Sequence, residues 1–219
     1  MRAIKKEAVL KGEKTRQEIL KTSVDIASAE GLEGLSIGKL ANEIGLSKSG
    51  LFAHFGSKED LQIAAVQTAA EIFVAEIIKP TEDSENGLIK LYAMLDAWIS
   101  YIERSIFRGG CFFFAVSAEM DDRPGKVRDL VAELTKSWVM KLESEAKLAV
   151  RLGELGNDRD VELLIFQVHG FVQEANWFYR LHEDKRAFEK ARLSILQTLE
   201  TFATESGKQI LLEIKNTKK

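Results

Sequence analysis

The stretch 35–61, LSIGKLANEIGLSKSGLFAHFGSKEDL, decides how this chain folds. Ser36 is a natural helix N-cap. Behind it, four apolar residues follow the i, i+3, i+4, i+7 spacing of one helix face: Ile37, Leu40, Ala41 and Ile44. Gly45 ends this short helix, and Ser47 can cap another that runs from Lys48 to Phe55. We therefore expect two short helices joined by a tight turn.

The residue types in this stretch meet the steric needs of a helix-turn-helix. Ala41 is small where the second helix must cross the first, and Gly45 allows the positive φ of a tight turn without a Cβ clash. Four apolar side chains can hold the crossing together: Leu40, Ile44, Leu46 and Leu51. An ordinary corner between two helices would show the same small-residue spacing, so the spacing alone leaves both interpretations open.

Polar groups gather where a recognition helix would present them. Ser47, Lys48, Ser49 and Gly50 open the second helix, and His54 lies near its end. The N-terminal end of such a helix enters the major groove of DNA, with hydroxyl and amide groups near the phosphates. We expect this helix to contact double-stranded DNA.

The remaining segments also show helical spacing of apolar residues, and none shows the sustained alternation of a strand. The predicted fold is all-α, with an N-terminal three-helix domain followed by a larger helical domain. Further helices are expected over residues 15–29, 58–78, 88–107, 111–118, 126–152, 160–182 and 185–204. Because short helices give way to long ones near residue 58, we expect one domain over 1–58 and a second over 59–219.

The formal net charge of −3 hides an uneven distribution. Residues 1–58 hold ten Lys and Arg against seven Asp and Glu, and residues 1–21 alone hold seven against three. A basic N-terminal arm could lie along DNA phosphates. A solvated basic tail would have the same composition.

Several other classes of protein are disfavoured. Cys111 is the single cysteine, which rules out an intramolecular disulfide and a cysteine-based zinc site. No charge-free apolar run approaches the roughly 18–20 residues of a membrane span, and the basic N-terminus lacks the apolar region of a signal peptide. The three histidines, His54, His169 and His182, are scattered, and no HExxH, GxSxG, Walker or Rossmann sequence occurs. We expect a cytoplasmic protein that is not an enzyme, does not associate with a membrane, and needs no metal and no cofactor.

The stretch quoted above resembles the DNA-binding segment of the TetR family of transcriptional regulators. The resemblance extends from a helix beginning near Thr15 through the start of the helix after Gly56, about a quarter of the chain. Residues 109–129, GGCFFFAVSAEMDDRPGKVRD, resemble a stretch of the regulatory domain in one TetR subgroup. The remaining likeness is one of helix lengths and order.

The resemblance implies that eight residues face DNA: Ser36, Ser47, Lys48, Ser49, Gly50, Phe52, His54 and Lys58. Phe52 stands where the family usually has a tyrosine that reaches a phosphate, so that hydroxyl contact is missing in this chain. Gly50 costs about 1 kcal/mol relative to alanine inside a helix. Its absent side chain either permits a close approach to DNA or leaves the helix pliable until it is bound.

The resemblance also implies that residues 59–219 form a ligand-binding and dimerisation domain, in which the last two helices pair with those of a second copy. The predicted dimer seams are Val161, Leu164, Ile165, Val168, Phe171, Val172 and Ala175 on one helix, and Phe188, Ala191, Ile195, Leu199 and Phe202 on the other. From the pattern alone, each seam could equally face the chain's own core.

Aromatic side chains are frequent in the second domain and have polar neighbours, as is typical of small-molecule sites. The predicted ligand contacts are Trp98, Phe107, Cys111, Phe113, Trp138, His169, Gln173 and Trp177. A hydrogen-bonded core histidine and an inert buried thiol are the plainer interpretations of His169 and Cys111.

These observations predict a ligand-responsive repressor. A homodimer would bind a palindromic operator, and a small-molecule effector would release it by moving the helix that follows the helix-turn-helix. The alternative is a helical ligand-binding or interaction protein that has lost DNA binding. Phe52 favours this alternative, whereas the hydroxyl and basic groups of Ser36, Ser47, Lys48 and Lys58 oppose it.

Overall fold

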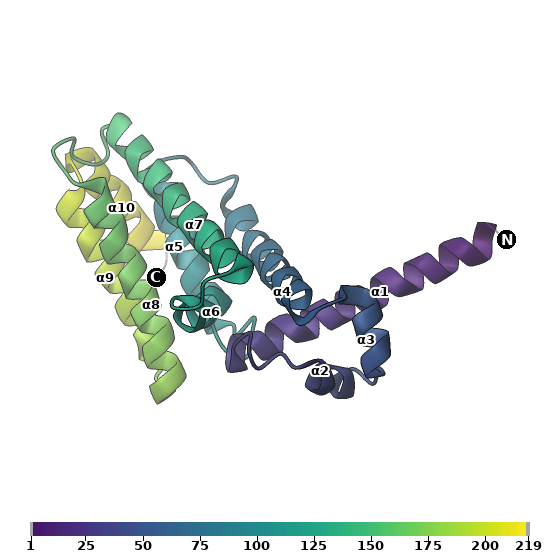
Figure 1. Cartoon of the computed structure of the whole chain (residues 1–219). Helices are drawn as coiled ribbons and strands as arrows, with labels where there is room; N and C mark the ends of the chain where they lie inside the picture. Colours follow the sequence, from purple (N-terminus) through teal and green to yellow (C-terminus); the bar gives the residue numbers. More distant parts are fainter. Residues whose placement is uncertain (1, 218–219) are drawn as a thin grey trace. The chain divides into compact units, whose positions relative to one another are not determined.

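The computed structural model describes residues 2–217, except for the side chains of residues 2–11, Phe52 and Thr217. Within that part of the chain the regular structure is helical and contains no strand, which confirms the all-α prediction (Figure 1). The elements are α1 (Arg2–Glu30), α2 (Ile37–Glu43), α3 (Lys48–Phe55), α4 (Lys58–Phe73), η1 (Val74–Ile78), η2 (Lys79–Thr81), α5 (Leu88–Glu103), α6 (Phe112–Met120), α7 (Lys126–Arg151), α8 (Val161–His182), α9 (Arg186–Phe202) and α10 (Glu205–Thr217).

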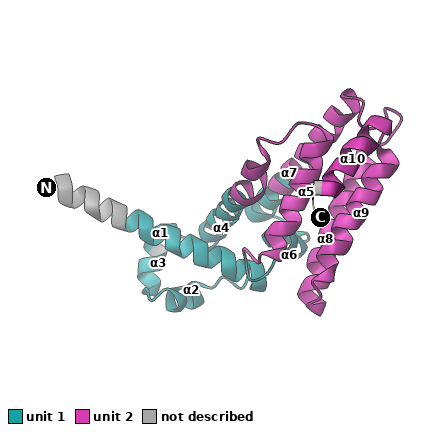
Figure 2. Cartoon of the chain, turned by 180° about the vertical axis from the view of Figure 1, so that it is seen from behind, with its two compact units in different colours: residues 1–72, 107–133 teal, residues 73–106, 134–219 magenta. Residues whose placement is uncertain are grey.

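The chain divides into two compact units, coloured separately in Figure 2. The first unit combines residues 1–72 with 107–133, and the second combines 73–106 with 134–219. The helix α7 therefore begins in the first unit and ends in the second. The predicted domain boundary at residue 58, which rests on the change from short to long helices, stays a prediction.

The core of the first unit is built on α1, which packs against α6. Its buried members include Ile19, Val24, Ala27, Leu61, Ala65, Phe112 and Val116. The segment before α6 approaches α1 closely, because a Cβ on Gly109 would lie 1.9 Å from the carbonyl oxygen of Ser28. The Gly109 amide donates to the Ser28 hydroxyl at 3.1 Å, and the Arg108 amide donates to Asp25 at 3.0 Å. Only glycine fits at residue 109.

The second unit packs α5 against α8 and α9, which run side by side (Figures 1 and 2). Nine of the sixteen residues of α5 are buried, so this helix forms the centre of the unit. Arg192 of α9 donates to Asp96 at 2.7 Å and to Glu103 at 2.8 Å, and both carboxylates belong to α5. This ion-pair network joins two elements that lie almost 100 residues apart in the sequence.

Two helix boundaries differ clearly from the prediction, and one helix was missed. The first helix begins at Arg2 rather than near Thr15, and α5 ends at Glu103 rather than near residue 107. A final helix, α10, was not predicted at all. Its start is marked by Thr204, whose hydroxyl accepts the Gly207 amide at 3.2 Å, and it is anchored by Leu211, which is buried. The cap followed by an acidic first turn is the signal that could have identified it.

One helical run, Lys58–Thr81, is long and apolar enough by length and composition to cross a membrane. It includes 24 residues, and 44% of its most apolar window is buried within the protein. In the first unit it behaves as a core helix: Leu61 and Val66 are fully buried, and Gln62 donates to the carbonyl of Leu32 at 2.9 Å. A buried helix of a globular unit passes the same test of length and hydropathy.

Candidate functional site

The turn between α2 and α3 has the geometry of a helix-turn-helix. The Ser36 hydroxyl caps α2 by accepting the Lys39 amide at 3.1 Å. Gly45 has φ +69°, and the next amide, that of Leu46, returns to the carbonyl of Ala41 at 2.9 Å. Leu40, Ala41 and Leu51 are buried at the crossing. Ala41 therefore lies at the helix crossing and Gly45 in the turn, as the sequence predicted.

The first turn of α3 presents polar groups to solvent. Ser47, Lys48 and Ser49 are exposed and Gly50 is half-buried. The Ser47 hydroxyl accepts the Gly50 amide at 3.0 Å and lies 3.1 Å from the Ser49 hydroxyl. The Lys48 stem lies over Gly38 of α2, since a Cβ on Gly38 would lie 3.2 Å from Lys48 Cε. This turn can offer two hydroxyl groups and one ammonium group to an anionic surface.

Two other predicted DNA contacts, His54 and Lys58, already contact neighbouring residues of this chain. His54 is half-buried beside Phe55, with ring centroids 6.3 Å apart. The Lys58 ammonium donates to the Glu33 carboxylate at 2.9 Å and to the Glu33 carbonyl at 3.2 Å. That hydrogen bond from Lys58 lowers the pKa of Glu33. A phosphate at this position would have to replace an exposed carboxylate, which is a small cost for a solvated pair. The side chain of Phe52 lies outside the described residues.

A contact that sequence reasoning missed holds the segment between α1 and α2. The Glu119 carboxylate of α6 accepts the Leu32 amide at 2.6 Å and the Glu33 amide at 2.8 Å. Gly31 has φ +78°, and a Cβ there would lie 2.5 Å from Glu119 Oε2. We call this arrangement the Glu119 clamp. It holds the segment that leads into α2, although Glu119 lies 87 positions from Leu32 in the sequence. No local sequence pattern predicts this contact.

Part of the predicted ligand set comes together in the second unit. The rings of Trp98 and Trp138 have centroids 5.6 Å apart, and His169 lies 5.0 Å from Trp98. Phe73, absent from the prediction, packs 4.9 Å from Trp138. Burial lowers the pKa of His169. Within the described residues, the indole N–H groups of Trp98 and Trp138 have no hydrogen-bond partner.

The rest of that set lies elsewhere. Phe107, Cys111 and Phe113 belong to the first unit. The ring of Phe112 lies 6.3 Å from that of Phe107 and 5.4 Å from that of Phe113, measured between centroids. Cys111 is buried and is not part of a disulfide. Trp177 is 44% exposed on α8. The eight residues are therefore divided between the two units, which the helical spacing of the sequence does not indicate.

The predicted dimer seams need revision. Nine of their twelve residues are buried in the second unit of this single chain: Leu164, Ile165, Val168, Val172, Ala175, Phe188, Ala191, Ile195 and Leu199. They form the chain's own core, which is the alternative that the pattern left open. Val161, Phe171 and Phe202 are half-buried.

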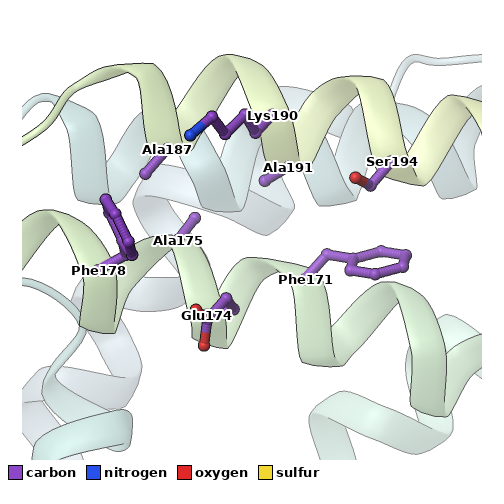
Figure 3. Close-up of a pocket in the computed structure, with 8 residues that line it drawn as sticks. All are labelled: Phe171, Glu174, Ala175, Phe178, Ala187, Lys190, Ala191 and Ser194. Atoms are coloured by element: carbon purple, nitrogen blue, oxygen red, sulfur yellow. The ribbon is translucent and has the colours of Figure 1, made fainter.

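The same two helices present a different apolar surface to solvent. Large apolar side chains are exposed at Leu163, Phe166, Trp177 and Leu181 of α8 and at Leu193 of α9. Beside them a groove of about 260 Å³ runs between the helices, lined by Phe171, Glu174, Ala175, Phe178, Ala187, Lys190, Ala191 and Ser194 (Figure 3). We call these five exposed residues and the groove the α8–α9 surface. Exposed large apolar side chains that gather on neighbouring helices are typical of an interaction site.

Two protein-family models match the chain. Residues 19–65 match the model described as bacterial regulatory proteins, tetR family, and residues 87–195 match the one described as tetracyclin repressor-like, C-terminal domain. This chain belongs to the TetR family. TetR-family proteins are helix-turn-helix transcriptional regulators and not enzymes, in agreement with the prediction.

Relatives of this TetR-family chain are similar over most of its length. The HTH-type transcriptional regulator TcmR of Streptomyces glaucescens is 25% identical over 193 residues, 85% of this chain and 83% of TcmR. A TetR transcriptional regulator from Chloroflexus aurantiacus superposes with a TM-score of 0.82 at 24% identity, covering 88% of this chain and 98% of that one. A transcriptional regulator from Saccharomonospora viridis, solved with choline, gives 0.72 at 15% identity over 88% and 100% of the two chains. The two structural relatives share the fold.

Proposed function

We propose that this TetR-family regulator is a cytoplasmic repressor that binds a palindromic operator as a homodimer and leaves it when a small molecule binds. The observation that carries the proposal is the exposed first turn of α3. Ser47, Lys48 and Ser49 point polar groups outward from a helix whose inner face is held by Leu51. A helix packed in this way is able to enter a major groove.

In this proposal the residues around that turn make different contacts with DNA. Ser36 already accepts a backbone amide, so its hydroxyl hydrogen remains available to a phosphate oxygen. Ser47 and Ser49 share one hydrogen bond between their hydroxyl groups, which leaves one of the two hydroxyl hydrogens for a phosphate. Lys48 adds a mobile positive charge beside them. Lys58 would contribute a second one after it leaves Glu33. In this proposal Gly50 permits the close approach of the helix, His54 lies at its far end, and Phe52 adds no hydroxyl contact.

A salt titration of DNA binding tests this assignment. The chain is titrated onto labelled DNA from its own promoter region, and anisotropy is read between about 50 and 200 mM salt. We expect a steep loss of affinity with salt, and Lys48→Ala should reduce the slope of log K against log salt by about 1. The matched control is Lys147→Ala, which removes an exposed lysine of α7 that pairs with Glu143 at 3.1 Å. Equal slopes for wild type and Lys48→Ala would remove Lys48 from the interface.

The second candidate is a ligand-binding protein that has lost DNA binding. The missing hydroxyl at Phe52 is the observation that favours it. The same titration separates the two candidates, because a protein of this kind would bind promoter DNA no more tightly than unrelated DNA of equal length.

The dimer assignment rests on the α8–α9 surface. A second copy related by a twofold axis would cover Phe166 and its apolar neighbours and form a four-helix bundle. One recognition helix reads only a few base pairs, so two are needed for a specific operator. The twofold axis of the protein would then appear in the DNA as a palindrome.

The effector assignment rests on the aromatic interior of the second unit. The structural relative from Saccharomonospora viridis was solved with choline, which supports the expectation that proteins of this fold hold small molecules. Binding inside the long helices would favour one conformation and weaken operator binding, and a coupling of roughly 1–3 kcal/mol would produce a several-fold to hundredfold effect.

A further inference from the structure

Arg16 of α1 stacks on Phe55, the last residue of α3, where the two helices pass beside each other (Figure 1). Its guanidinium carbon lies 5.0 Å from the centroid of the Phe55 ring, within the roughly 6 Å of a cation–π contact. Phe55 is 9% exposed, so its ring is held in the interior of the first unit, whereas Arg16 is exposed to solvent. The contact therefore attaches an exposed charge of α1 to the helix that carries the candidate DNA contacts.

Most cations of the first unit are paired with a carboxylate, but Arg16 is not. Six of its described lysines and arginines have an ion pair: Lys39, Lys58, Arg108, Arg123, Lys126 and Arg128. Four have none among the described residues: Lys14, Arg16, Lys21 and Lys48. Three of these four belong to α1, and the fourth belongs to the first turn of α3. The unpaired positive charge of the unit therefore lies on the two helices that Arg16 and Phe55 join.

Among the three unpaired cations of α1, Arg16 is the one on the side of α3. Lys14 precedes it by two residues and Lys21 follows it by five, which turn a helix by about 200° and about 140°. Both lysines therefore lie on other sides of α1. Glu13 and Glu18, the acidic residues nearest to Arg16 in the sequence, form no ion pair with it within the described residues.

A guanidinium group stacked in this way keeps its hydrogen-bond donors available. The ring contact uses the flat face of the group, whereas its N–H donors point outward from the edge. Two of them can bind one phosphate together, in the parallel arrangement that arginine makes with phosphate oxygens. Because Phe55 already restricts the side chain, Arg16 loses less conformational entropy when it binds an anion.

We propose that Arg16 is a ninth DNA-contacting residue, which donates to a phosphate oxygen beside the far end of α3 and is positioned there by Phe55. The rings of His54, the candidate contact at that end, and Phe55 have centroids 6.3 Å apart, so Arg16 and His54 share a neighbour. The inference rests on the proposed function, because it adds a contact to the same DNA interface. Since phosphates carry no sequence information, the contact adds affinity without sequence preference.

Salt titrations of Arg16→Ala test the phosphate contact. The full chain is titrated onto labelled DNA from its own promoter region between about 50 and 200 mM salt, with anisotropy as the readout. Loss of one phosphate contact should reduce the slope of log K against log salt by about 1 and the affinity about tenfold. A residue that only supports α3 would change the affinity or the Tm and not the slope. An unchanged slope in the folded variant would therefore overturn the proposal.

Two further substitutions of Arg16 separate its charge from its stacking. Arg16→Lys keeps the positive charge and loses the flat group, so the slope should match wild type while the affinity falls about threefold, the value of an exposed cation–π contact. Arg16→Gln removes the charge and keeps most of the stem, so it replaces the alanine variant if that variant does not fold. A slope reduced equally by lysine and by glutamine would show that charge is not what Arg16 contributes.

Phe55→Leu tests the positioning of Arg16 by a double-mutant cycle. With leucine at residue 55, Arg16→Ala should cost about threefold in DNA affinity rather than about tenfold, because the guanidinium group is no longer held against a ring. Equal costs in both backgrounds would show that Phe55 does not position Arg16. The affinity of Arg16→Lys gives the same information if Phe55→Leu does not fold.

Lys21→Ala is the matched control. Lys21 is exposed on the same helix, has no ion pair among the described residues and lies on another side of α1. Its removal should change neither the slope nor the affinity, and a loss equal to that of Arg16→Ala would show a general effect of charge. Arg16→Ala should also weaken promoter DNA and unrelated DNA of equal length by the same factor. A loss confined to promoter DNA would show that Arg16 acts on base recognition and not on phosphate.

The wild-type titration separates this inference from the proposed function. Wild-type protein that fails to bind DNA would overturn the repressor and the Arg16 contact together. Promoter-specific binding by the wild type, with the same slope for Arg16→Ala, would overturn the Arg16 contact alone and leave the repressor standing.

Discussion

Individual residues at the start of α3 stabilise the helix and, in the proposed function, also contact DNA. The Ser47 hydroxyl is an N-cap, because it accepts the Gly50 amide at 3.0 Å, and it is exposed to solvent. A Cβ on Gly50 would lie 3.1 Å from that hydroxyl oxygen, so a side chain there must displace it by a few tenths of an ångström. Gly50 therefore keeps both the cap and the open approach to the first turn.

Gly50→Ala should separate stability from DNA binding. Alanine stabilises a helix by about 1 kcal/mol relative to glycine, which corresponds to a rise in Tm of about 2–4 °C for a protein of this size. We expect an unchanged or higher Tm in circular dichroism and an operator affinity that is about tenfold lower in anisotropy, because the methyl group moves the Ser47 hydroxyl. A folded variant that binds the operator as wild type does would contradict this role of Gly50.

Glu119, the residue that forms the Glu119 clamp, is a second single residue whose removal should have a measurable effect. Glu119→Ala leaves the amides of Leu32 and Glu33 without their acceptor. The Leu32 amide is partly buried, so we expect the free energy of unfolding to fall by about 1–3 kcal/mol in urea titrations. Operator affinity should fall as well, since the same amides lead into α2. Asp129→Ala, at an exposed carboxylate of the same unit, is the control and should change neither quantity. A Glu119→Ala variant as stable as wild type would show that water replaces the carboxylate without loss.

At the scale of helices, α8 carries three polar side chains, His169, Gln173 and Asn176, that are half-buried or buried. His169 lies against Trp98 and its pKa is lowered by burial. The unfolded chain accepts a proton near pH 6.5, and the folded chain accepts it only at lower pH. Stability from this group is therefore fully present above pH 6.5 and is lost as the pH falls below it, because the unfolded state binds more protons there.

His169→Gln should reduce the loss of stability in acid. The free energy of unfolding is measured in urea at pH 7.5 and pH 5.5 for both proteins. The wild type should lose more than the variant between these values, and a single group sets an upper limit of about 1.4 kcal/mol per pH unit on the difference. His54 and His182 are present in both proteins and cancel in the comparison. Identical losses would place the His169 titration at its ordinary pKa.

Helix order could be predicted from the sequence because glycine, serine and proline punctuate it. Gly45 and Gly56, both with positive φ, end α2 and α3 where the sequence indicated. The inward and outward faces of α8 could not be predicted, because this helix has apolar residues on both sides: Leu164 is fully buried and Phe166 is 79% exposed. The same difficulty distributed the predicted ligand residues over two units. Long-range contacts such as the Glu119 clamp have no local pattern.

For the whole molecule, the two faces of α8 belong to different surfaces. The inward face of α8 forms part of the core and places His169 against Trp98. The outward face belongs to the α8–α9 surface. In the proposed dimer, an effector that moved α8 would therefore change both the packing of the core and the contact with the second copy. In this proposal operator binding would depend on that contact, because the separation of two recognition helices must match the spacing of two half-sites.

Phe166→Glu tests whether the dimer uses this surface. A buried glutamate would face its own copy across the twofold axis, and an unpaired charge in an apolar interface costs several kcal/mol. We expect a dimer for the wild type and a monomer for the variant in sedimentation, with operator affinity falling at least a hundredfold because one recognition helix acts alone. Met140→Glu is the matched control, since Met140 is exposed on α7, away from α8 and α9 in the sequence, and the variant should stay dimeric. If Phe166→Glu remains a dimer with full affinity, the α8–α9 surface is not the interface, and the second recognition helix must be supplied through another face.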